Sequence, residues 1–373
     1  MRLSFLGPSA VIAALALGAC SATGAHDGLA AGVTSSDTSG AGGASGGDAA
    51  ASSSSGGGGD ATTITGLGGG VSADAGETTF SAYAHTNDTL FKIDPGKAGL
   101  GLTEIGTFGC IGSGGDASMT DLAVNGSGDL WGVSPTHAHR LALPAGGTGT
   151  VQCTLSIPIV SPSSGSFLGL TFAPVGVLDP SKEVLVASNS AGELWAIDTA
   201  TGTLTQHGSF GTVPADDGHG HAYKYPGTRW ELSGDIVFLA NKGSPVGFAT
   251  VRDCPKSSWP KSTNCNATDT LVELDLAALA VPGAQVVVSS VRGQVVKAAG
   301  CNDGAHTGYG SMFGIAAFQD KVFGFSRQSA TVGAIVSIDN VDGTACLILP
   351  TPGDGWAGAA ITTVAPVEPP TQT

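Results

Sequence analysis

The stretch LWAIDTATGTLT, residues 194–205, sets the pattern that the rest of the chain repeats. Apolar side chains alternate along the strand up to Asp198, the turn Thr-Ala-Thr-Gly follows, and a second short strand begins after Gly202. Asp198 can accept hydrogen bonds from the turn amides, and Gly202 can adopt the positive φ that most residues avoid. The segment therefore predicts a β-hairpin.

Near-copies of this hairpin recur along the chain, each as the third strand of a four-strand unit. The copies are LFKID at 90–94, LVELD at 271–275, IVSID at 335–339 and a degenerate AHRLAL at 138–143. The expected first strands are 121–126, 168–174, 229–234, 312–318 and 356–364. The expected second strands are 80–85, 130–134, 184–189, 236–241 and 322–327, and the fourth strands are 103–109, 150–158, 203–210, 284–290 and 345–350.

Repeats of four strands are typical of β-propellers. The first unit begins at its second strand, and the chain ends on an unpartnered first strand, so both ends can share one blade and leave no open edge. We expect an all-β, five-bladed propeller over residues 77–364; a six-bladed ring stays open because the fourth blade is long. In its repeat pattern the domain resembles bacterial extracytoplasmic propellers of the NHL and YVTN-repeat type.

Composition supports this fold and limits the partners. Only 12% of the residues are charged, Gly contributes 59 residues, and the net charge is −15. Few charges with many Gly, Thr, Val and Ser favour short strands and turns. Because nothing concentrates Lys and Arg against phosphates, we expect no nucleic-acid partner.

The N-terminus carries an export signal. Arg2 precedes an apolar run from Leu3 to Leu17, and Leu-Gly-Ala-Cys follows at 17–20. This tetrapeptide resembles the bacterial lipobox, which implies removal of residues 1–19 and a lipid on Cys20. Ser21 after the cysteine resembles outer-membrane lipoproteins by the enterobacterial sorting rule. We therefore expect a lipid-anchored protein of the cell envelope, on the periplasmic side or the cell surface, that contacts the membrane through its anchor; an ordinary cleaved signal is the alternative.

Two segments flank the propeller. Residues 20–76 consist mainly of Ala, Gly, Ser, Thr and Asp and contain almost no large apolar residue. Such a segment cannot bury enough surface to offset its ordering entropy, so a disordered, flexible tether is expected. A disordered tail is expected over 365–373, and a monomeric head domain between the two.

Six cysteines remain when Cys20 is set aside, and an even number in an exported protein suggests disulfides. Cys110 and Cys301 each precede the first strand of a blade, and Cys153 and Cys346 lie in the fourth strands of those blades. This parallel placement predicts the pairs Cys110–Cys153 and Cys301–Cys346. Cys254 and Cys265 remain, both inside a long insertion at 243–269, and would close a small loop.

The candidate binding face follows from the blade assignment. Two kinds of connection emerge on the same face of a propeller: those from strand four of one blade to strand one of the next, and those from strand two to strand three within a blade. In this sequence these connections are longer than the connections expected on the opposite face. The opposite face is expected to have only short turns. The candidate binding residues on the long-loop face are His85, Asp116, His137, His139, Asp216, Asp217, His219, His221, Tyr223, Tyr225, Arg229, Trp259, Asp303, His306, Tyr309 and Trp356.

Two functions are compatible with this face. The first is a non-enzymatic propeller that binds a protein, glycan or small ligand. The second is a metal-dependent hydrolase: His219, His221 and Asp217 could hold a divalent metal, although a solvated Gly-rich loop that simply tolerates these residues is the favoured interpretation. Lactonases of the gluconolactonase type are propellers with a metal held by Glu, Asn and Asp, and Glu231, Asn241 and Asp121 could supply those elements. No G-x-S-x-G, H-E-x-x-H or P-loop motif occurs within residues 77–364.

Overall fold

The structure is a computed structural model, and it describes residues 80–112, 115–163, 165–256, 264–304, 306–329, 331–353 and 355–367. They all belong to one compact unit, Ser72–Thr373. The expected signal peptide, Cys20 and the tether lie outside the described residues. The expected tail is described only to Val367; there Ala365 and Val367 are buried, so this part belongs to the propeller. Among the described residues, no helix is long and apolar enough to cross a membrane.

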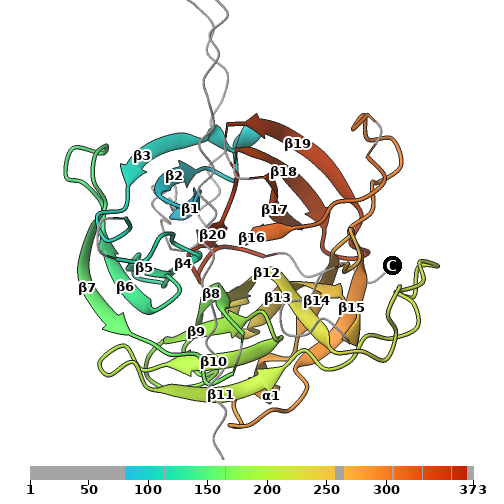
Figure 1. The fold of residues 1–373 in the computed structure, drawn as a ribbon, viewed down its shortest axis with the longest axis horizontal. Coiled ribbons are helices and arrows are strands. Elements are labelled where there is room, and N and C mark those ends of the chain that lie inside the picture. The colour runs from blue at the N-terminus through green and yellow to red at the C-terminus, as the bar shows by residue number, and fades with distance from the viewer. Residues whose placement is uncertain are drawn as a thin grey trace, which may run out of the picture. The chain divides into compact units, whose positions relative to one another are not determined.

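Five four-stranded antiparallel sheets surround a common centre, so the protein is a five-bladed β-propeller (Figure 1). In each blade the first-named strand is the innermost and the last-named is the outermost. Blade one consists of β20 (Gly358–Ile361), β1 (Ala82–His85), β2 (Thr89–Ile93) and β3 (Thr103–Thr107). Blade two consists of β4 (Asp121–Val124), β5 (Leu130–Val133), β6 (His137–Ala142) and β7 (Gln152–Pro158). Blade three consists of β8 (Phe167–Ala173), β9 (Val184–Asn189), β10 (Glu193–Ile197) and β11 (Leu204–Ser209).

Blades four and five complete the ring. Blade four consists of β12 (Trp230–Leu239), β13 (Val246–Asp253), β14 (Thr270–Leu274) and β15 (Val288–Gln294). Blade five consists of β16 (Met312–Phe318), β17 (Lys321–Ser329), β18 (Val332–Asp339) and β19 (Ala345–Pro352). Three short helical turns lie in connections: η1 (Ala98–Gly101), η2 (Asn241–Gly243) and α1 (Leu276–Leu279).

The two ends of the propeller meet in blade one, as the repeat pattern predicted. Strand β20 pairs antiparallel with β1, and Ala82 lies opposite Ile361 while His85 lies opposite Gly358. The hairpin after β10 is also confirmed: Asp198 Oδ1 accepts hydrogen bonds from the amides of Ala200 (2.8 Å) and Thr201 (3.1 Å). Gly202 has a φ of 74°.

Blade four differs from the prediction in its first two strands. The segments 229–234 and 236–241 were expected as separate strands, but they form one ten-residue strand, β12. The sequence Ser-Gly-Asp at 233–235 resembles a turn. In the structure these residues remain within β12 and interrupt its regular pairing with β13. A side chain on Gly234 would collide with the backbone of β16. The second strand is β13, inside the expected insertion, and β15 lies later than 284–290. No sixth blade is present in the described residues.

Adjacent blades pack through apolar side chains, and three disulfides tie connections to strands. Trp230 lies in a cluster shared by blades three and four, and Trp356 lies where blades five and one meet. The disulfides are Cys110–Cys153, Cys254–Cys265 and Cys301–Cys346, which are the pairs that the repeat positions predicted.

Candidate functional site

The two ends of the propeller carry different connections. We call loop face the end with the connections from strand four to strand one and from strand two to strand three, and turn face the opposite end. The turn face is not limited to short turns, contrary to expectation: residues 174–183 join β8 to β9, and residues 275–287, which include α1, join β14 to β15. Both ends therefore have to be considered as sites.

Seven of the candidate residues on the loop face are buried and cannot meet a ligand at the surface: His85, His139, Asp217, Tyr223, Asp303, Tyr309 and Trp356. Trp356 is fully buried and packs edge-on against Phe91 (ring centroids 5.4 Å apart) and Phe325 (5.6 Å). Such aromatic side chains, placed where a connection enters a blade, fill the space between neighbouring blades. Their residue type suggested binding, but their position gives them a packing role.

Asp116 organises a hydrogen-bonded network in blade two. Its Oδ2 atom accepts from Ser134 Oγ (2.5 Å) and the amide of Thr136 (3.0 Å). Ser134 Oγ also lies 2.9 Å from Nε2 of the buried His139, whose Nδ1 lies 2.8 Å from Ser156 Oγ. Burial lowers the pKa of His139 to about 4, so the ring is neutral at pH 7.

This network does not have the order of a catalytic triad. In such a triad the imidazole lies between the serine and the acid, whereas here Ser134 lies between Asp116 and His139. Ser134 is also fully buried. His137 stacks on His139 with ring centroids 5.7 Å apart, and its Nδ1 lies 3.6 Å from Asp116 Oδ2. The group therefore anchors the β5–β6 connection.

The loop Asp-Asp-Gly-His-Gly-His at 216–221 is built around one carboxylate. Asp217 accepts hydrogen bonds from the amides of His219 (2.9 Å), His221 (3.0 Å) and Gln294 (3.1 Å), and from His221 Nδ1 (2.8 Å). Burial opposes the charge, but these hydrogen bonds outweigh it and lower the pKa of Asp217 to about 2. Its neighbour Asp216 is exposed and accepts from the amide of Gly218 (2.9 Å).

The divalent-metal site proposed for this loop stays a prediction. The ring of His221 reaches Asp217, whereas His219 contacts Asp217 through its backbone amide. Two sets of three potential ligands converge within the described residues: Cys110, His139 and Cys153, and Glu231, Cys254 and Cys265. Each set contains a disulfide, and disulfide sulfurs are not the thiolates that ligate metals.

The β15–β16 connection is held by a buried tyrosine–carboxylate pair. Tyr309 donates its hydroxyl proton to Asp303, which also accepts from the amide of Leu347 (3.0 Å). Burial and the adjacent carboxylate raise the pKa of Tyr309 well above its usual value. His306 is exposed and stacks on Tyr309, with ring centroids 5.7 Å apart.

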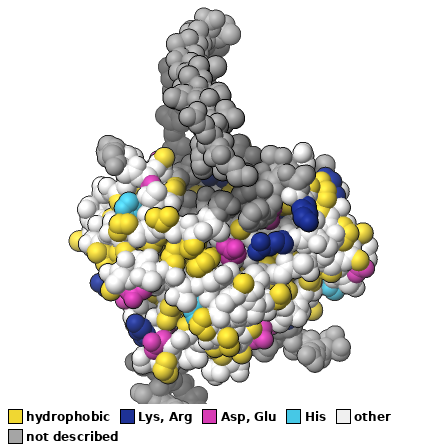
Figure 2. Space-filling view, turned by 60° about the horizontal axis from the view of Figure 1, so that its bottom comes forward, with side chains coloured by type: hydrophobic (Ala, Val, Ile, Leu, Met, Phe, Trp, Pro, Cys, Tyr) yellow, Lys and Arg dark blue, Asp and Glu magenta, His cyan; other side chains and the backbone are white. Residues whose placement is uncertain are grey.

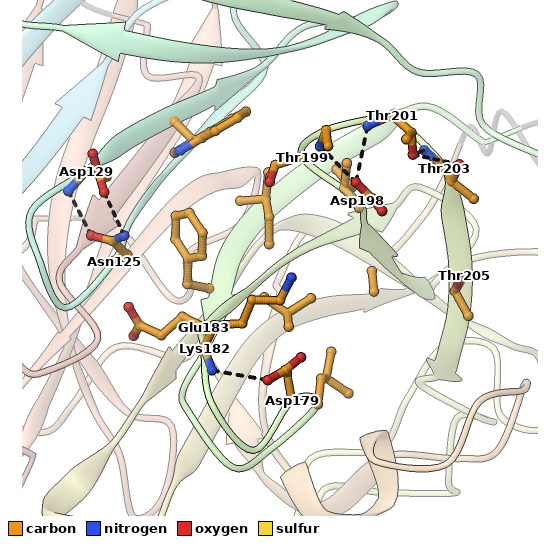
Figure 3. A pocket seen from close by; sticks show the side chains of 18 of the residues that line it. Asn125, Asp129, Asp179, Lys182, Glu183, Asp198, Thr199, Thr201, Thr203 and Thr205 are labelled. Atoms are coloured by element: carbon orange, nitrogen blue, oxygen red, sulfur yellow. Dashed lines mark hydrogen bonds between the residues drawn. The ribbon is translucent and has the colours of Figure 1, made fainter.

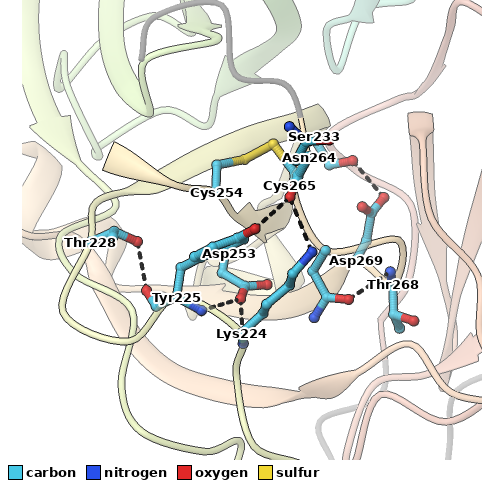
Figure 4. The surroundings of a disulfide bond; sticks show 11 residues. Lys224, Tyr225, Thr228, Ser233, Asp253, Cys254, Asn264, Cys265, Thr268 and Asp269 are labelled. Atoms are coloured by element: carbon cyan, nitrogen blue, oxygen red, sulfur yellow. Dashed lines mark hydrogen bonds between the residues drawn. A yellow bond between two sulfur atoms is a disulfide. The ribbon is translucent and has the colours of Figure 1, made fainter. Parts of the chain in front are cut away.

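The loop face of blade four is closed by Asp253 and the smallest disulfide loop (Figure 4). Asp253 Oδ2 accepts from the amides of Lys224 (2.7 Å) and Tyr225 (2.9 Å), and the Tyr225 hydroxyl donates to the carbonyl of Asn264 (2.8 Å). A cavity of about 380 Å³ adjoins Cys254 and is lined by Gly227, Thr228, Arg229, Glu231, Pro255 and Lys256. Trp259 lies outside the described residues.

The lactonase-like set Glu231, Asn241 and Asp121 does not converge. Glu231 is the second residue of β12, and Asn241 follows its last residue, Leu239, by two positions. A strand rises about 3.3 Å per residue, so these two residues are separated by roughly the length of the blade. Asp121 begins β4 in blade two.

A larger cavity, of about 930 Å³, opens on the turn face between blades two and three (Figure 3). We call it the blade 2–3 groove. Its polar lining comes from the β4–β5 turn, β6, the β8–β9 connection and the β10–β11 hairpin: Asn125, Asp129, Arg140, Asp179, Lys182, Glu183, Asp198, Thr199, Thr201, Thr203 and Thr205. Apolar side chains of Leu155, Phe172 and Leu178 also line it.

Charge and hydroxyl groups are distributed over the whole groove. Arg140 pairs with Asp129 at 2.5 Å, while Asp179 accepts from the amide of Lys182 at 3.2 Å. Four carboxylates line the groove and only two basic residues, so its lining is acidic. On the face drawn in Figure 2, the charged side chains are scattered among uncharged residues, in keeping with the low overall charge.

The groove was absent from the sequence prediction because two blades form it. Signals existed: the connection at 174–183 is long for a hairpin, and threonines alternate at 199, 201, 203 and 205. In the structure Thr199, Thr201 and Thr203 lie in the turn between β10 and β11, and Thr205 lies in β11. Neither signal by itself indicates that the segments meet.

No protein family and no curated protein matches this chain. Solved structures with a similar course of the chain include a protein of unknown function from Bacteroides caccae (10% identity, 76% of this chain and 99% of that chain, TM-score 0.37). A protein from Lactobacillus plantarum is also similar (14% identity, 76% of this chain and 70% of that chain, TM-score 0.33). So is a putative TolB from Agrobacterium tumefaciens (11% identity, 75% of this chain and 84% of that chain, TM-score 0.32).

Proposed function

We propose that this protein is a lipid-anchored binding protein of the cell envelope whose propeller holds a neutral glycan in the blade 2–3 groove. One observation carries the proposal: exposed hydroxyl, carboxylate and ammonium groups and apolar side chains line the same cavity of about 930 Å³. Sugars present hydroxyls that donate and accept hydrogen bonds, together with apolar C–H faces. The volume lies at the upper end of the range usual for ligand pockets.

Charge narrows the class of ligand. Asp129, Asp179, Glu183 and Asp198 face Arg140 and Lys182, and one of the two basic groups is already paired with Asp129. An anionic glycan would meet net repulsion in this groove, since like charges at short distance are unfavourable. A neutral glycan avoids this cost.

The loop face is less suited to bind a ligand than the blade 2–3 groove. There, the carboxylates of Asp116, Asp217 and Asp253 accept hydrogen bonds from the protein's own loops. In the groove, Lys182 and Thr205 are exposed to solvent. The lactonase-like alternative has no converged set of ligands, because Glu231 and Asn241 lie at opposite ends of β12.

The anchor can be tested separately from the ligand. Metabolic labelling with a radioactive fatty acid should label the wild-type chain in its native host, and Cys20→Ser should abolish the label. A labelled Cys20→Ser chain, or an unlabelled wild type that is released as an ordinary secreted protein, would contradict lipid anchoring.

The groove is tested with the purified full chain on an array of neutral and anionic glycans. We expect neutral glycans to bind, and Lys182→Ala combined with Thr205→Ala to weaken binding at least tenfold. His219→Ala, an exposed change on the loop face, is the matched control and should leave binding unchanged. Binding that follows His219 instead of the groove, or a protein partner captured without any glycan, would overturn the proposal.

A further inference from the structure

Two buried polar atoms face one another at the centre of the ring, where the innermost strands of blades one and two meet. His85 ends β1 and lies opposite Gly358 of β20, and Asp121 begins β4. Both side chains are fully buried (0% exposed). His85 Nε2 and Asp121 Oδ1 have no hydrogen-bond partner among the described residues. A buried polar atom without a partner is unfavourable, so each requires an explanation.

The tautomer of His85 follows from its surroundings. Its Nδ1 lies 2.6 Å from the carbonyl oxygen of Thr86, which can only accept, so Nδ1 carries the proton and donates it. In the neutral imidazole the other nitrogen, Nε2, is then an acceptor. Nε2 is left with a lone pair. A histidine that ligates a metal commonly has this arrangement, with its other nitrogen donating to a backbone carbonyl.

Asp121 presents a second acceptor to the same space. Its Oδ2 accepts from the amide of Leu170, which leaves Oδ1 on the side of His85. A side-chain carbon on Gly358 would overlap both His85 Nε2 and Asp121 Oδ1. The two atoms thus converge on the space that glycine leaves open. Two acceptors that face each other repel, unless a proton or a metal ion lies between them.

A second carboxyl group lies beside Asp121. Asp235 of β12 accepts from the amides of Ile236 (2.5 Å) and Ile315 (2.6 Å), and interacts with Asp121. The nearest basic group acting on His85 is Arg327, which is partly exposed and hydrogen-bonded to Asn87 (2.9 Å). Its charge is therefore screened by solvent, and Arg327 is a hydrogen-bond partner of neither unpaired atom.

We infer that this place is a divalent-metal site, with His85 Nε2 and Asp121 Oδ1 as the protein ligands and Asp235 as a charge-balancing neighbour. Mixed imidazole and carboxylate donors suit Zn²⁺ and related transition metals, whereas Ca²⁺ favours six to eight oxygen ligands. Zn²⁺ lies about 2.0–2.2 Å from such ligands, closer than a carbon atom can approach them. The ion binds at the junction of three blades and stabilises the ring, because ligand binding to the folded state shifts the folding equilibrium.

The test measures metal in the full chain, purified once from cells grown with Zn²⁺ and once after refolding with Zn²⁺, Co²⁺ or Ca²⁺. We expect about one Zn²⁺ per chain by elemental analysis, a rise in Tm with Zn²⁺ and not with Ca²⁺, and a visible Co²⁺ absorption of a nitrogen–oxygen site. His85→Gln and Asp121→Asn should each lower the metal affinity at least tenfold and abolish the rise in Tm.

The combined change Asp217→Asn and His221→Ala is the matched control, because it removes the other pair of potential ligands and should leave the metal in place. If His85→Gln does not fold, Asp121→Asn, which keeps the size of the side chain, supplies an independent test. Wild-type chain without stoichiometric metal under every refolding condition would overturn the inference. Metal that persists in His85→Gln and Asp121→Asn but is lost in the loop variant would overturn it as well.

Discussion

The loop face and the blade 2–3 groove contain the same kinds of side chain but use them differently. On the loop face, Asp217 accepts three backbone amides and a histidine ring, and Asp253 accepts two amides. In the groove, Lys182 and Thr205 are exposed in a cavity of about 930 Å³. Residue type therefore does not distinguish a binding site from a structural one. The groove carboxylates also accept hydrogen bonds from the chain, as Asp198 does from Ala200 and Thr201, so the distinction is that the groove leaves exposed side chains around an open cavity.

This difference has a physical origin in the lengths of the connections. A long loop that folds back over a blade carries backbone N–H groups that must be satisfied. Aspartates satisfy them locally, as Asp217 does for the amides of His219 and His221. Hairpins on the turn face satisfy most of their amides within the turn, so side chains further along remain available to a ligand. Changes on the loop face should therefore affect stability, and changes in the groove should affect binding.

The largest effect is expected from the disulfides that tie loop-face connections to outer strands. Replacing Cys110 and Cys153 by Ala should lower the free energy of unfolding by about 4 kcal/mol, because their separation of 43 residues gives a large entropy gain to the unfolded chain. Replacing Cys254 and Cys265, separated by 11 residues, should cost about 3 kcal/mol. Urea unfolding of the two double variants measures both. A larger loss for the smaller loop would mean that its native contacts, rather than loop closure, determine its contribution.

The next effect is expected at Asp217. Asp217→Ala removes the acceptor of three amides around a buried carboxylate and should lower the free energy of unfolding by about 2–4 kcal/mol. Asp216→Ala is the matched control: this neighbour is exposed and accepts from Gly218 at 2.9 Å, so the change should cost under about 1 kcal/mol. Equal losses at the two positions, measured by urea unfolding, would remove the distinction between a structural and a solvated aspartate.

Features that recur in every blade could be predicted from the sequence. The turn at Asp198 and the cysteine pairs follow from local chemistry or from matching positions in the repeat. Ring closure follows because the chain begins at a second strand and ends on a first. Each of these predictions requires only the sequence of one four-strand repeat or the comparison of two repeats.

Features that depend on contacts between particular blades could not be predicted. Ser-Gly-Asp at 233–235 resembles a turn, yet Gly234 packs on the backbone of β16 and the strand continues. Trp356 and Tyr309 resemble ligand-binding aromatics, yet the neighbouring blade covers them. The blade 2–3 groove needs the β4–β5 turn beside the β10–β11 hairpin. The order of the blades in the ring determines which segments are neighbours, and the sequence of neither segment indicates the contact.

A smaller effect, dependent on pH, is expected from His139. Its pKa is depressed to about 4 by burial, so the unfolded chain binds a proton between about pH 6.5 and 4 that the folded chain does not. Its contribution is therefore complete above pH 6.5 and is lost as the pH falls toward 4, by about 2 kcal/mol.

His139→Gln should abolish this part of the pH dependence. The informative quantity is the difference in free energy of unfolding between variant and wild type at pH 7 and pH 4.5, because all other titratable groups are common to the two proteins. A difference that does not change with pH would show that His139 takes up its proton without disturbing the Asp116 network.

The smallest effect on stability is expected in the groove, although binding should change there most. Lys182→Ala and Thr205→Ala alter exposed side chains, so each should change the free energy of unfolding by no more than about 0.5 kcal/mol. The same variants should weaken glycan binding, because a ligand in the groove uses the groups that the fold leaves exposed. Asp217→Ala should do the opposite, with lower stability and unchanged affinity at a temperature where the variant is folded. Urea unfolding and glycan titration on one set of proteins give both quantities, and a groove variant that loses stability together with affinity would show that the groove belongs to the scaffold.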